Sequence, residues 1–370
     1  MSQMKRPSLK VALGLIILIG TLLLFRLGLH PFQLSAKESI YEKTRLYMGT
    51  FVTVKVVAEN AAKAQEIIDA AFGEIEKIEG LMSRYRENSE VSRLNRLAHM
   101  TPQVVSPETF EVLMSSGEIF RNSGGAFDAT IAPLIKLWQK AAKENHPPRP
   151  EEIAQAKALV DYAQVILDEK ARTVFFAQPG ISLDLGGIAK GCAVDKAVEA
   201  IKAHGARAAL VDAGGDIYVL GSGPDGSGWR IKIQDPAGGE SGLGVVEVKN
   251  RAVVTSGNYQ RFFEIAGRRY SHIVDPRSGW PAEGVASVTV IAPQATLADG
   301  LATALSVLGE TEGLKLIESL PDVECLMVVG EKDSFRQVQS SGFSKFLARS
   351  SFKGEPTRPP VPQQFPPPNP

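Results

Sequence analysis

A glycine-rich segment, DLGGIAKG from Asp184 to Gly191, has the composition of a phosphate-binding turn. Residues 181–185 predict a strand and residues 189–204 a helix, so the glycines lie where a strand leads into a helix. Glycine lets the backbone approach a phosphate, and a helix start offers unbonded N–H groups and positive potential. Lys190 adds a mobile positive charge. The segment is not a Walker A loop, and a tight connection without any ligand is the alternative that the pattern leaves open.

A second candidate site is the pair Asp299 and Thr303, which lie four residues apart in a predicted helix over 297–308. Residues at this spacing share one face of a helix. A carboxylate and a hydroxyl are hard oxygen donors, which suit Mg²⁺ because this ion takes few protein ligands and keeps water or phosphate oxygens. The alternative is structural: Asp299 would stabilise the first helical turn, and Thr303 would bond to its own helix.

A histidine lies close to a predicted turn in SHIVDPRSG, residues 271–279. His272 comes at the end of a strand predicted over 268–274, where it could accept a proton from an attacking hydroxyl. A purely structural hydrogen bond is the alternative. A further glycine turn with two carboxylates, DAGGD from Asp212 to Asp216, could form the floor of a pocket or be only a turn.

The helices and strands that must position these residues do not alternate regularly along the sequence. Apolar residues at helical spacing predict a helix over 61–82, and Ser106 followed by Pro107 is typical of the start of a second helix over 107–123. Without strict alternation of strands and helices, we expect an α+β or mixed α/β fold. The remaining helices are predicted over 151–159 and 312–319, and the remaining strands over 45–57, 165–167, 173–176, 208–212, 229–234, 244–248, 252–255, 259–265, 285–292 and 325–329.

The two ends of the chain differ in composition from the body. We expect a basic cytoplasmic tail (1–8), a transmembrane signal-anchor or a cleaved signal peptide (9–29), and a tether (30–42). Basic residues before the apolar run place the body, residues 43–350, on the extracytoplasmic (periplasmic) side of the cell inner membrane. The proline-rich end, 351–370, lacks the apolar content to pack and is expected to be disordered.

Charge and cysteine content exclude several classes of protein. The formal net charge is zero, so nothing indicates a nucleic-acid partner. The only cysteines, Cys192 and Cys325, do not form a C-x-x-C pair, which argues against zinc and dithiol chemistry. A single disulfide between them remains open at this stage.

Taken together and in order, these segments resemble the ApbE family of flavin transferases. Eight matching segments extend over about 260 residues, and their order makes the resemblance specific. They are MGT from Met48, SEVSRLN from Ser89, GAFD from Gly125 with Pro133 and Trp138, DLGGIAKG from Asp184, DAGGD from Asp212, TSGNYQRFF from Thr255, SHIVDPRSG from Ser271 and ADGLATAL from Ala298.

The resemblance implies a mixed α/β body with FAD bound in a deep cleft. It implies cleavage of the FAD pyrophosphate, transfer of FMN through a phosphoester bond to a threonine of an acceptor protein, and release of AMP. Acceptors in the family are subunits of membrane redox pumps or FMN-carrying domains. A Mg²⁺-dependent FAD pyrophosphatase and a non-catalytic flavin-binding or scaffold protein are the alternatives.

The resemblance also assigns residues. It implies that Mg²⁺ is held by Asp299, Thr303 and the backbone carbonyl of Gly187, and that His272 lies at the active site, where we interpret it as the base. Positions matching FAD contacts are Met48, Ala126, Phe127, Asp128, Asp184, Lys190 and Ile273, and Tyr85 lies where an aromatic ring covers the flavin. The chain departs from the family at Cys192, where an aromatic is common, at Asn258, often acidic, and in offering no lipid-modified cysteine.

Overall fold

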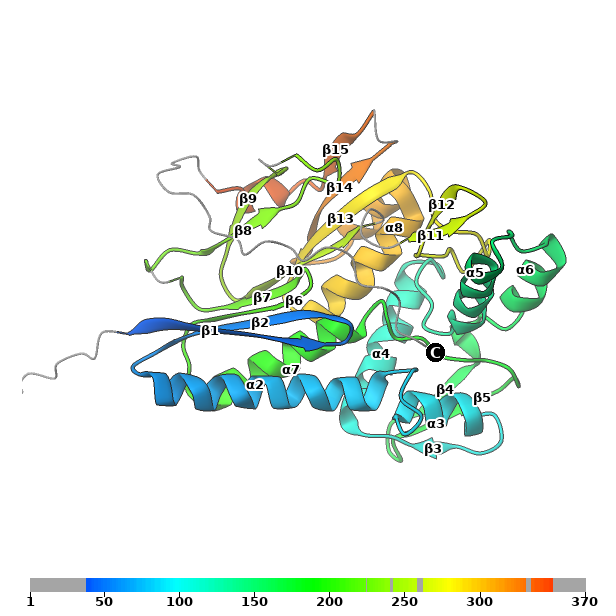
Figure 1. The fold of residues 1–370 in the computed structure, drawn as a ribbon, viewed down its shortest axis with the longest axis horizontal. Helices are drawn as coiled ribbons and strands as arrows, with labels where there is room; N and C mark the ends of the chain where they lie inside the picture. The colour runs from blue at the N-terminus through cyan, green and yellow to red at the C-terminus, as the bar shows by residue number, and fades with distance from the viewer. Residues whose placement is uncertain (1–37, 224, 240–241, 258–261, 331–333, 349–370) are drawn as a thin grey trace, which may run out of the picture. The chain divides into compact units, whose positions relative to one another are not determined.

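The computed structural model describes residues 38–348 except 224, 240–241, 258–261 and 331–333 (Figure 1). The chain divides into two units, Met1–Ser39 and Ile40–Pro370, and the description below concerns the second. The predicted tail, membrane segment and proline-rich end lie outside the described residues. Among the helices that are described, none is long and apolar enough to cross a membrane.

An eight-stranded sheet organises the body, and the registered pairs of neighbouring strands are antiparallel. Alternation of side chains explains its position: Val52, Val54 and Val56 on one face of a strand are fully buried. In sheet order the strands are β1 (Ser39–Tyr47), β2 (Thr50–Ala58), β6 (Ala209–Ala213), β7 (Asp216–Leu220), β10 (Arg251–Gly257), β13 (Val285–Ala292), β14 (Glu324–Val329) and β15 (Arg336–Gln339).

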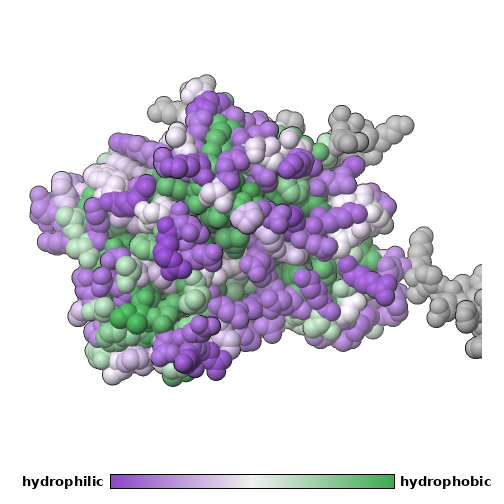
Figure 2. All heavy atoms as spheres, turned by 180° about the vertical axis from the view of Figure 1, so that it is seen from behind, coloured by the Kyte–Doolittle hydropathy of each residue, from purple (hydrophilic) through white to green (hydrophobic). Residues whose placement is uncertain are grey.

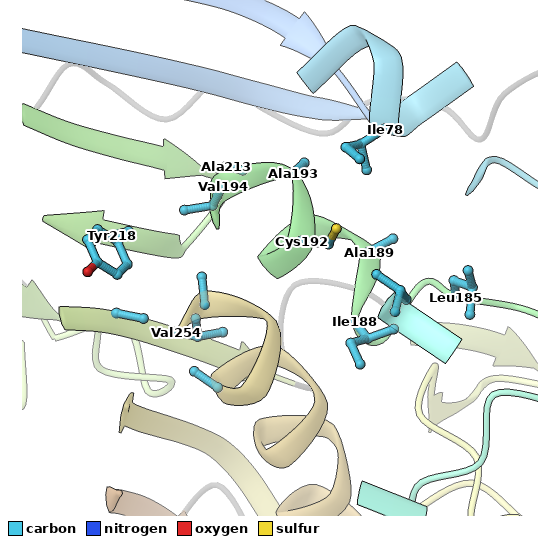
Figure 3. Packing of buried hydrophobic residues seen from close by; sticks show 14 of the residues in the cluster. Ile78, Leu185, Ile188, Ala189, Cys192, Ala193, Val194, Ala213, Tyr218 and Val254 are labelled. Atoms are coloured by element: carbon cyan, nitrogen blue, oxygen red, sulfur yellow. The ribbon is translucent and has the colours of Figure 1, made fainter. Parts of the chain in front are cut away.

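Three helices cover one face of this sheet: α2 (Ala61–Met82), α7 (Ala189–Ala203) and α8 (Ala295–Glu318). Figure 3 shows the apolar layer that results, with Ile78 of α2, Cys192 of α7 and Val254 of β10 in one cluster. Helix α8 is interrupted at Gly309, where φ is 72° and ψ is −168°, so its two parts correspond to the two helices predicted over 297–308 and 312–319.

The opposite face of the sheet packs against a hairpin of β8 (Trp229–Ile233) and β9 (Gly244–Val248) and a short helix, η2 (Phe343–Phe346). A second hairpin, β11 (Phe262–Ile265) and β12 (Arg268–Ser271), forms a separate cluster with α5 (Ala132–Glu144) and α6 (Pro150–Lys157). The mixed α/β class expected from the sequence is therefore confirmed.

A small sheet of β3 (Gln103–Val104), β5 (Thr173–Phe176) and β4 (Val165–Asp168) lies with α3 (Glu90–Leu97), α4 (Pro107–Asn122) and the short η1 (Tyr162–Gln164). Several apolar side chains here are exposed, among them Met100, Val104 and Ile166. Figure 2 shows hydrophobic surface at the lower left, where these elements lie in that view.

Some local predictions were wrong. Residues 181–185 form no strand, apart from a single bridge between Ser182 and Ile131. The side chain of Asn95 replaces a neighbouring strand, since it bonds to the backbone N–H and C=O of Leu183 at 2.7 and 3.0 Å. Residues 39–42, expected in the tether, belong to β1. No element was predicted where the structure has α3, α5, β3, β7 and β15.

Candidate active site

A buried charge cluster forms where the start of α7 meets α8. The ammonium of Lys190 lies 2.7 Å from Asp216 Oδ2 and 3.4 Å from Asp299 Oδ1, and both carboxylate side chains are 2% exposed. Burial opposes the charge on Lys190, but the two carboxylates outweigh it and raise the pKa of the ammonium. Burial and the charge of Asp299 raise the pKa of Asp216 well above its ordinary value, although Lys190 opposes this shift. The Lys190 ammonium and the two buried carboxylates therefore form one ion-pair cluster at the start of α7.

Two further oxygen donors, from Thr303 and Gly187, lie beside the Asp299 carboxylate of this cluster. The Thr303 hydroxyl donates to the Gly187 carbonyl at 3.4 Å, and Asp299 precedes Thr303 by one turn of α8. A Cβ at Gly187 would lie 3.0 Å from Thr303 Oγ1, so glycine keeps the two oxygens close together. The described part of the chain holds no group of three His, Cys, Asp or Glu side chains suited to a metal. A carboxylate, a hydroxyl and a carbonyl fit a hard cation such as Mg²⁺ better than zinc.

The glycine turn before α7 is fixed by its own acidic residue. Asp184 Oδ2 accepts an ion-pair contact from Arg84 at 2.7 Å, and Oδ1 accepts the N–H of Gly186 at 2.8 Å. The ring of Phe127 lies against the same turn, because a Cβ at Gly187 would approach it to 3.5 Å. The structure thus brings the predicted positions Asp184, Phe127 and Gly187 together.

The carboxylate of Asp128 accepts three hydrogen bonds within the protein. Its Oδ1 accepts the N–H and hydroxyl of Thr130 at 2.7 and 2.6 Å, and its Oδ2 accepts the N–H of Tyr162 at 3.0 Å. Burial raises the pKa of Asp128, and these hydrogen bonds act in the opposite direction. The side chain therefore fixes the 126–128 turn, in which Ala126 and Phe127 are also buried.

Met48 lies in the turn between β1 and β2, near the Lys190 cluster. Met48 and Gly49 both have positive φ, 52° and 69°, which is the geometry of a tight hairpin turn. The next residue, Thr50, touches Gly214, since a Cβ there would lie 2.3 Å from Thr50 Oγ1. Because β7 begins two residues later at Asp216, the Met48 turn lies near the strand end that bonds Lys190.

His272 directly follows β12, is half-buried and has an interaction partner in the protein. The next residue, Ile273, is buried, and its carbonyl accepts the N–H of Ala282 at 2.9 Å, which closes a second turn. The buried indole of Trp138 donates to the carbonyl of Gly279 in this turn at 2.9 Å. The position of His272 is thus set by a well-bonded loop.

Two cavities border these residues. One, of about 260 Å³, is lined by residues of the His272 loop such as Tyr270 and Trp280, and by Val307, which follows Thr303 by one turn of α8. The other, of about 230 Å³, is lined by Arg84, Tyr85, Lys136 and Ser182 among others. Its chemistry suits an anionic aromatic ligand, because it combines cations with an exposed tyrosine ring.

Ser182, which lines the second cavity, has a buried hydroxyl without a hydrogen-bond partner among the described residues. The guanidinium of Arg84 stacks on the ring of Tyr85 at 4.5 Å and also pairs with Asp184. Arg84 therefore connects this cavity to the glycine turn.

The sequence reading missed three residues of this region: Arg84, Asp195 and Asp216. Asp216 was visible only as the second carboxylate of the DAGGD turn, and its contact with Lys190 depends on how β7 lies in the sheet. Nothing in the polar segment around Arg84 distinguished it from its neighbours. Asp195, on α7, bonds to the start of α8.

Comparisons with known proteins agree with this arrangement. The model of the ApbE family matches residues 48–327. The chain is 35% identical over 330 residues to the FAD:protein FMN transferase of Treponema pallidum, covering 85% of this chain and 91% of the relative. It is 33% identical over 307 residues to that of Vibrio cholerae, covering 82% and 91%.

Solved structures give the same result. The flavin transferase ApbE from Vibrio cholerae superposes with a TM-score of 0.75 at 31% identity, covering 84% of this chain and 100% of that one. The ApbE protein from Thermotoga maritima superposes with a TM-score of 0.76 at 32% identity, with the same coverage. The range matched by the family contains the glycine turn, the Lys190 cluster, the His272 loop and all of α8. On its sequence and its fold, this chain belongs to the ApbE family.

Proposed function

We propose that this protein is a Mg²⁺-dependent FAD:protein FMN transferase, which moves FMN from FAD to a threonine hydroxyl of an acceptor protein. Membership of a family whose relatives are named FAD:protein FMN transferase supports the reaction. The observation that carries the proposal is the convergence of Lys190, Asp299, Thr303 and the Gly187 carbonyl on one point. A pyrophosphate needs a site of this kind, with cationic charge and hard oxygen ligands for a metal.

In the proposed reaction the threonine oxygen forms a bond to the FMN-side phosphorus, and the bond from that phosphorus to the AMP oxygen breaks. The threonine proton passes to His272, and AMP leaves with the electron pair of the broken bond. Mg²⁺ held by Gly187, Asp299 and Thr303 would offset the charge of the pyrophosphate. Lys190 adds a fixed positive charge, because Asp216 holds its ammonium at 2.7 Å.

For FAD we propose a cleft that extends from the cavity beside Tyr85 to the Lys190 cluster. Met48, Ala126, Phe127, Asp128, Asp184 and Ile273 are the further positions proposed to contact it. The cations Arg84 and Lys136 support an anionic ligand in this cavity. Stacking of Tyr85 on the flavin would use a ring that is 67% exposed.

The test uses a candidate acceptor domain incubated with FAD, Mg²⁺ and the purified protein, followed by mass spectrometry. We expect a gain on the acceptor equal to the mass of FMN, which is lost with EDTA. Asp299→Ala should reduce the transfer rate at least 100-fold, a loss typical of removing a key electrostatic group. Asp168→Ala, which removes an exposed carboxylate on β4, is the matched control and should transfer normally.

Each other outcome has a defined meaning. Normal turnover by Asp299→Ala would contradict the metal assignment. Free FMN and AMP without any gain on the acceptor would favour the pyrophosphatase. Binding of FAD without any product would favour the non-catalytic flavin-binding protein.

The proposed partner is an acceptor with a threonine flavinylation motif, such as a redox-pump subunit or an FMN-carrying domain. We infer that residues 9–29 hold the body on the outer face of the inner membrane, as the apolar run and its basic flank suggest. Protease treatment of intact spheroplasts should then digest the body. Protection until the cells are lysed would contradict this location.

A further inference from the structure

Helix α8, which carries Asp299 and Thr303, begins without a cap of its own. Its N-cap residue, Gln294, makes no side-chain hydrogen bond to the helix. The first N–H groups of a helix have no partner within the helix, and when they are buried another group must accept them. The acceptor here comes from a different helix.

Asp195 of α7 supplies that acceptor with both carboxylate oxygens. Its Oδ1 accepts the N–H of Ala295 at 2.8 Å, and its Oδ2 accepts the N–H and the hydroxyl of Thr296 at 2.8 and 2.6 Å. A carboxylate at this end of a helix also interacts favourably with the helix dipole. Asp195 therefore binds the start of α8 through three hydrogen bonds.

The bond from Asp195 to Ala295 is one of three regularly spaced hydrogen bonds between residues 187–195 and residues 295–303. Asp195 bonds Ala295, the N–H of Gly191 donates to Asp299 Oδ2 at 3.1 Å, and the Gly187 carbonyl accepts the hydroxyl of Thr303. Each contact lies four residues from the next on both segments, in opposite directions. The two segments are therefore antiparallel, and the alignment of any one pair determines that of the other two.

We propose that Asp195 is a positioning residue for the Mg²⁺ site, which fixes the register of α8 against α7; this rests on the metal site proposed above. A slip of α8 by one residue would move Asp299 by about 1.5 Å and rotate it by about 100° around the helix. Asp299 would then lose the Gly191 N–H, and Thr303 would leave the Gly187 carbonyl. Asp195 itself does not touch the metal donors.

The experiment measures Mn²⁺ binding to the full chain, without FAD or acceptor, from the electron paramagnetic resonance signal of unbound Mn²⁺. Asp195→Ala should raise the Kd for Mn²⁺ at least tenfold, as loss of supporting contacts commonly does at metal sites. Asp195→Asn keeps one oxygen acceptor and should give a smaller rise. We therefore expect the Kd for Mn²⁺ to be highest in Asp195→Ala and intermediate in Asp195→Asn.

Asn60→Ala is the matched control. Asn60 caps α2 by accepting the N–H of Lys63 at 2.9 Å, so its loss also removes a helix cap, but from a helix without metal donors. We expect a smaller fall in Tm than in Asp195→Ala, because Asn60 makes one exposed capping bond, and a Kd for Mn²⁺ within twofold of wild type. If both alanine variants bind Mn²⁺ like wild type, Asp195 is only a cap and the inference is wrong. If wild type itself binds no Mn²⁺, the metal site and the inference fail together.

Discussion

Replacing Gly191 by alanine tests whether the contact between α7 and α8 sets the active site. A Cβ at Gly191 would lie 2.2 Å from the carbonyl oxygen of Ala295 and 2.8 Å from the Cα of Thr296. Both atoms belong to the backbone, so they cannot turn away as a side chain would. Since carbon atoms pack at about 3.5–4.0 Å, the two helices must move apart by roughly 1 Å.

The separation has two measurable consequences. Overpacking of this kind costs about 1–3 kcal/mol of unfolding free energy, which lowers Tm by roughly 1.5–5 °C for a body of about 300 residues. It also lengthens the 3.1 Å bond from the Gly191 N–H to Asp299. A displacement of about 1 Å at a reacting centre can reduce the rate about 100-fold, so FMN transfer should fall much more than stability does.

The assay compares Tm and the rate of FMN transfer for Gly191→Ala and Gly73→Ala. Gly73 lies within α2, and a Cβ there would meet nothing within 4 Å. Alanine is favoured over glycine inside a helix by about 0.5–1 kcal/mol, so Gly73→Ala should keep its activity and have an equal or higher Tm. Wild-type rate and Tm in Gly191→Ala would refute the reasoning.

Two further predictions concern the cysteines and a surface ion pair. Burial raises the pKa of the Cys192 and Cys325 thiols to about 12, and both are unpaired; at pH 8 about one thiol in ten thousand is then a thiolate. Iodoacetamide should therefore label them only after denaturation, and labelling of native protein within an hour would contradict this. The hydrogen bond from Lys77 lowers the pKa of Glu108 from its ordinary value of 4.5. Because the folded protein binds this proton less readily than the unfolded chain, the ion pair stabilises the fold above pH 4.5, and this stabilisation is lost as the pH falls below that value. Lys77→Met should cost up to about 1 kcal/mol at pH 7 and little at pH 3, and equal losses in urea unfolding at both pH values would refute it.

Helical geometry made part of the site predictable from sequence. Asp299 and Thr303 were expected on one face of a helix because of their spacing, and glycines before Lys190 indicated a close approach of backbone. These inferences depend on residues near one another in the chain. The α2 and α4 boundaries were predictable for the same reason, since Ser106 caps α4 as expected and accepts the N–H of Thr109.

Contacts between distant segments could not be predicted in this way. Segment 181–185 has the alternation of a strand because Ile181, Leu183 and Leu185 are buried, but the polar partner of its backbone is the side chain of Asn95. Most of strand β1 was not predicted, because most of its residues are exposed and its burial pattern does not alternate. Periodicity reports burial, and it does not identify the group that accepts each hydrogen bond.

The two carboxylates beside Lys190 differ in their hydrogen-bond partners. Lys190 is closer to Asp216, at 2.7 Å, than to Asp299, at 3.4 Å. The other oxygen of Asp299 also accepts the uncharged N–H of Gly191 at 3.1 Å, which helps to fix the orientation of the carboxylate. Asp216 therefore makes the shorter contact with the ammonium, and Asp299 is contacted by both Lys190 and the Gly191 N–H. In the proposed reaction, this arrangement lets one buried cluster hold an ammonium near the pyrophosphate and present the Asp299 carboxylate to the metal.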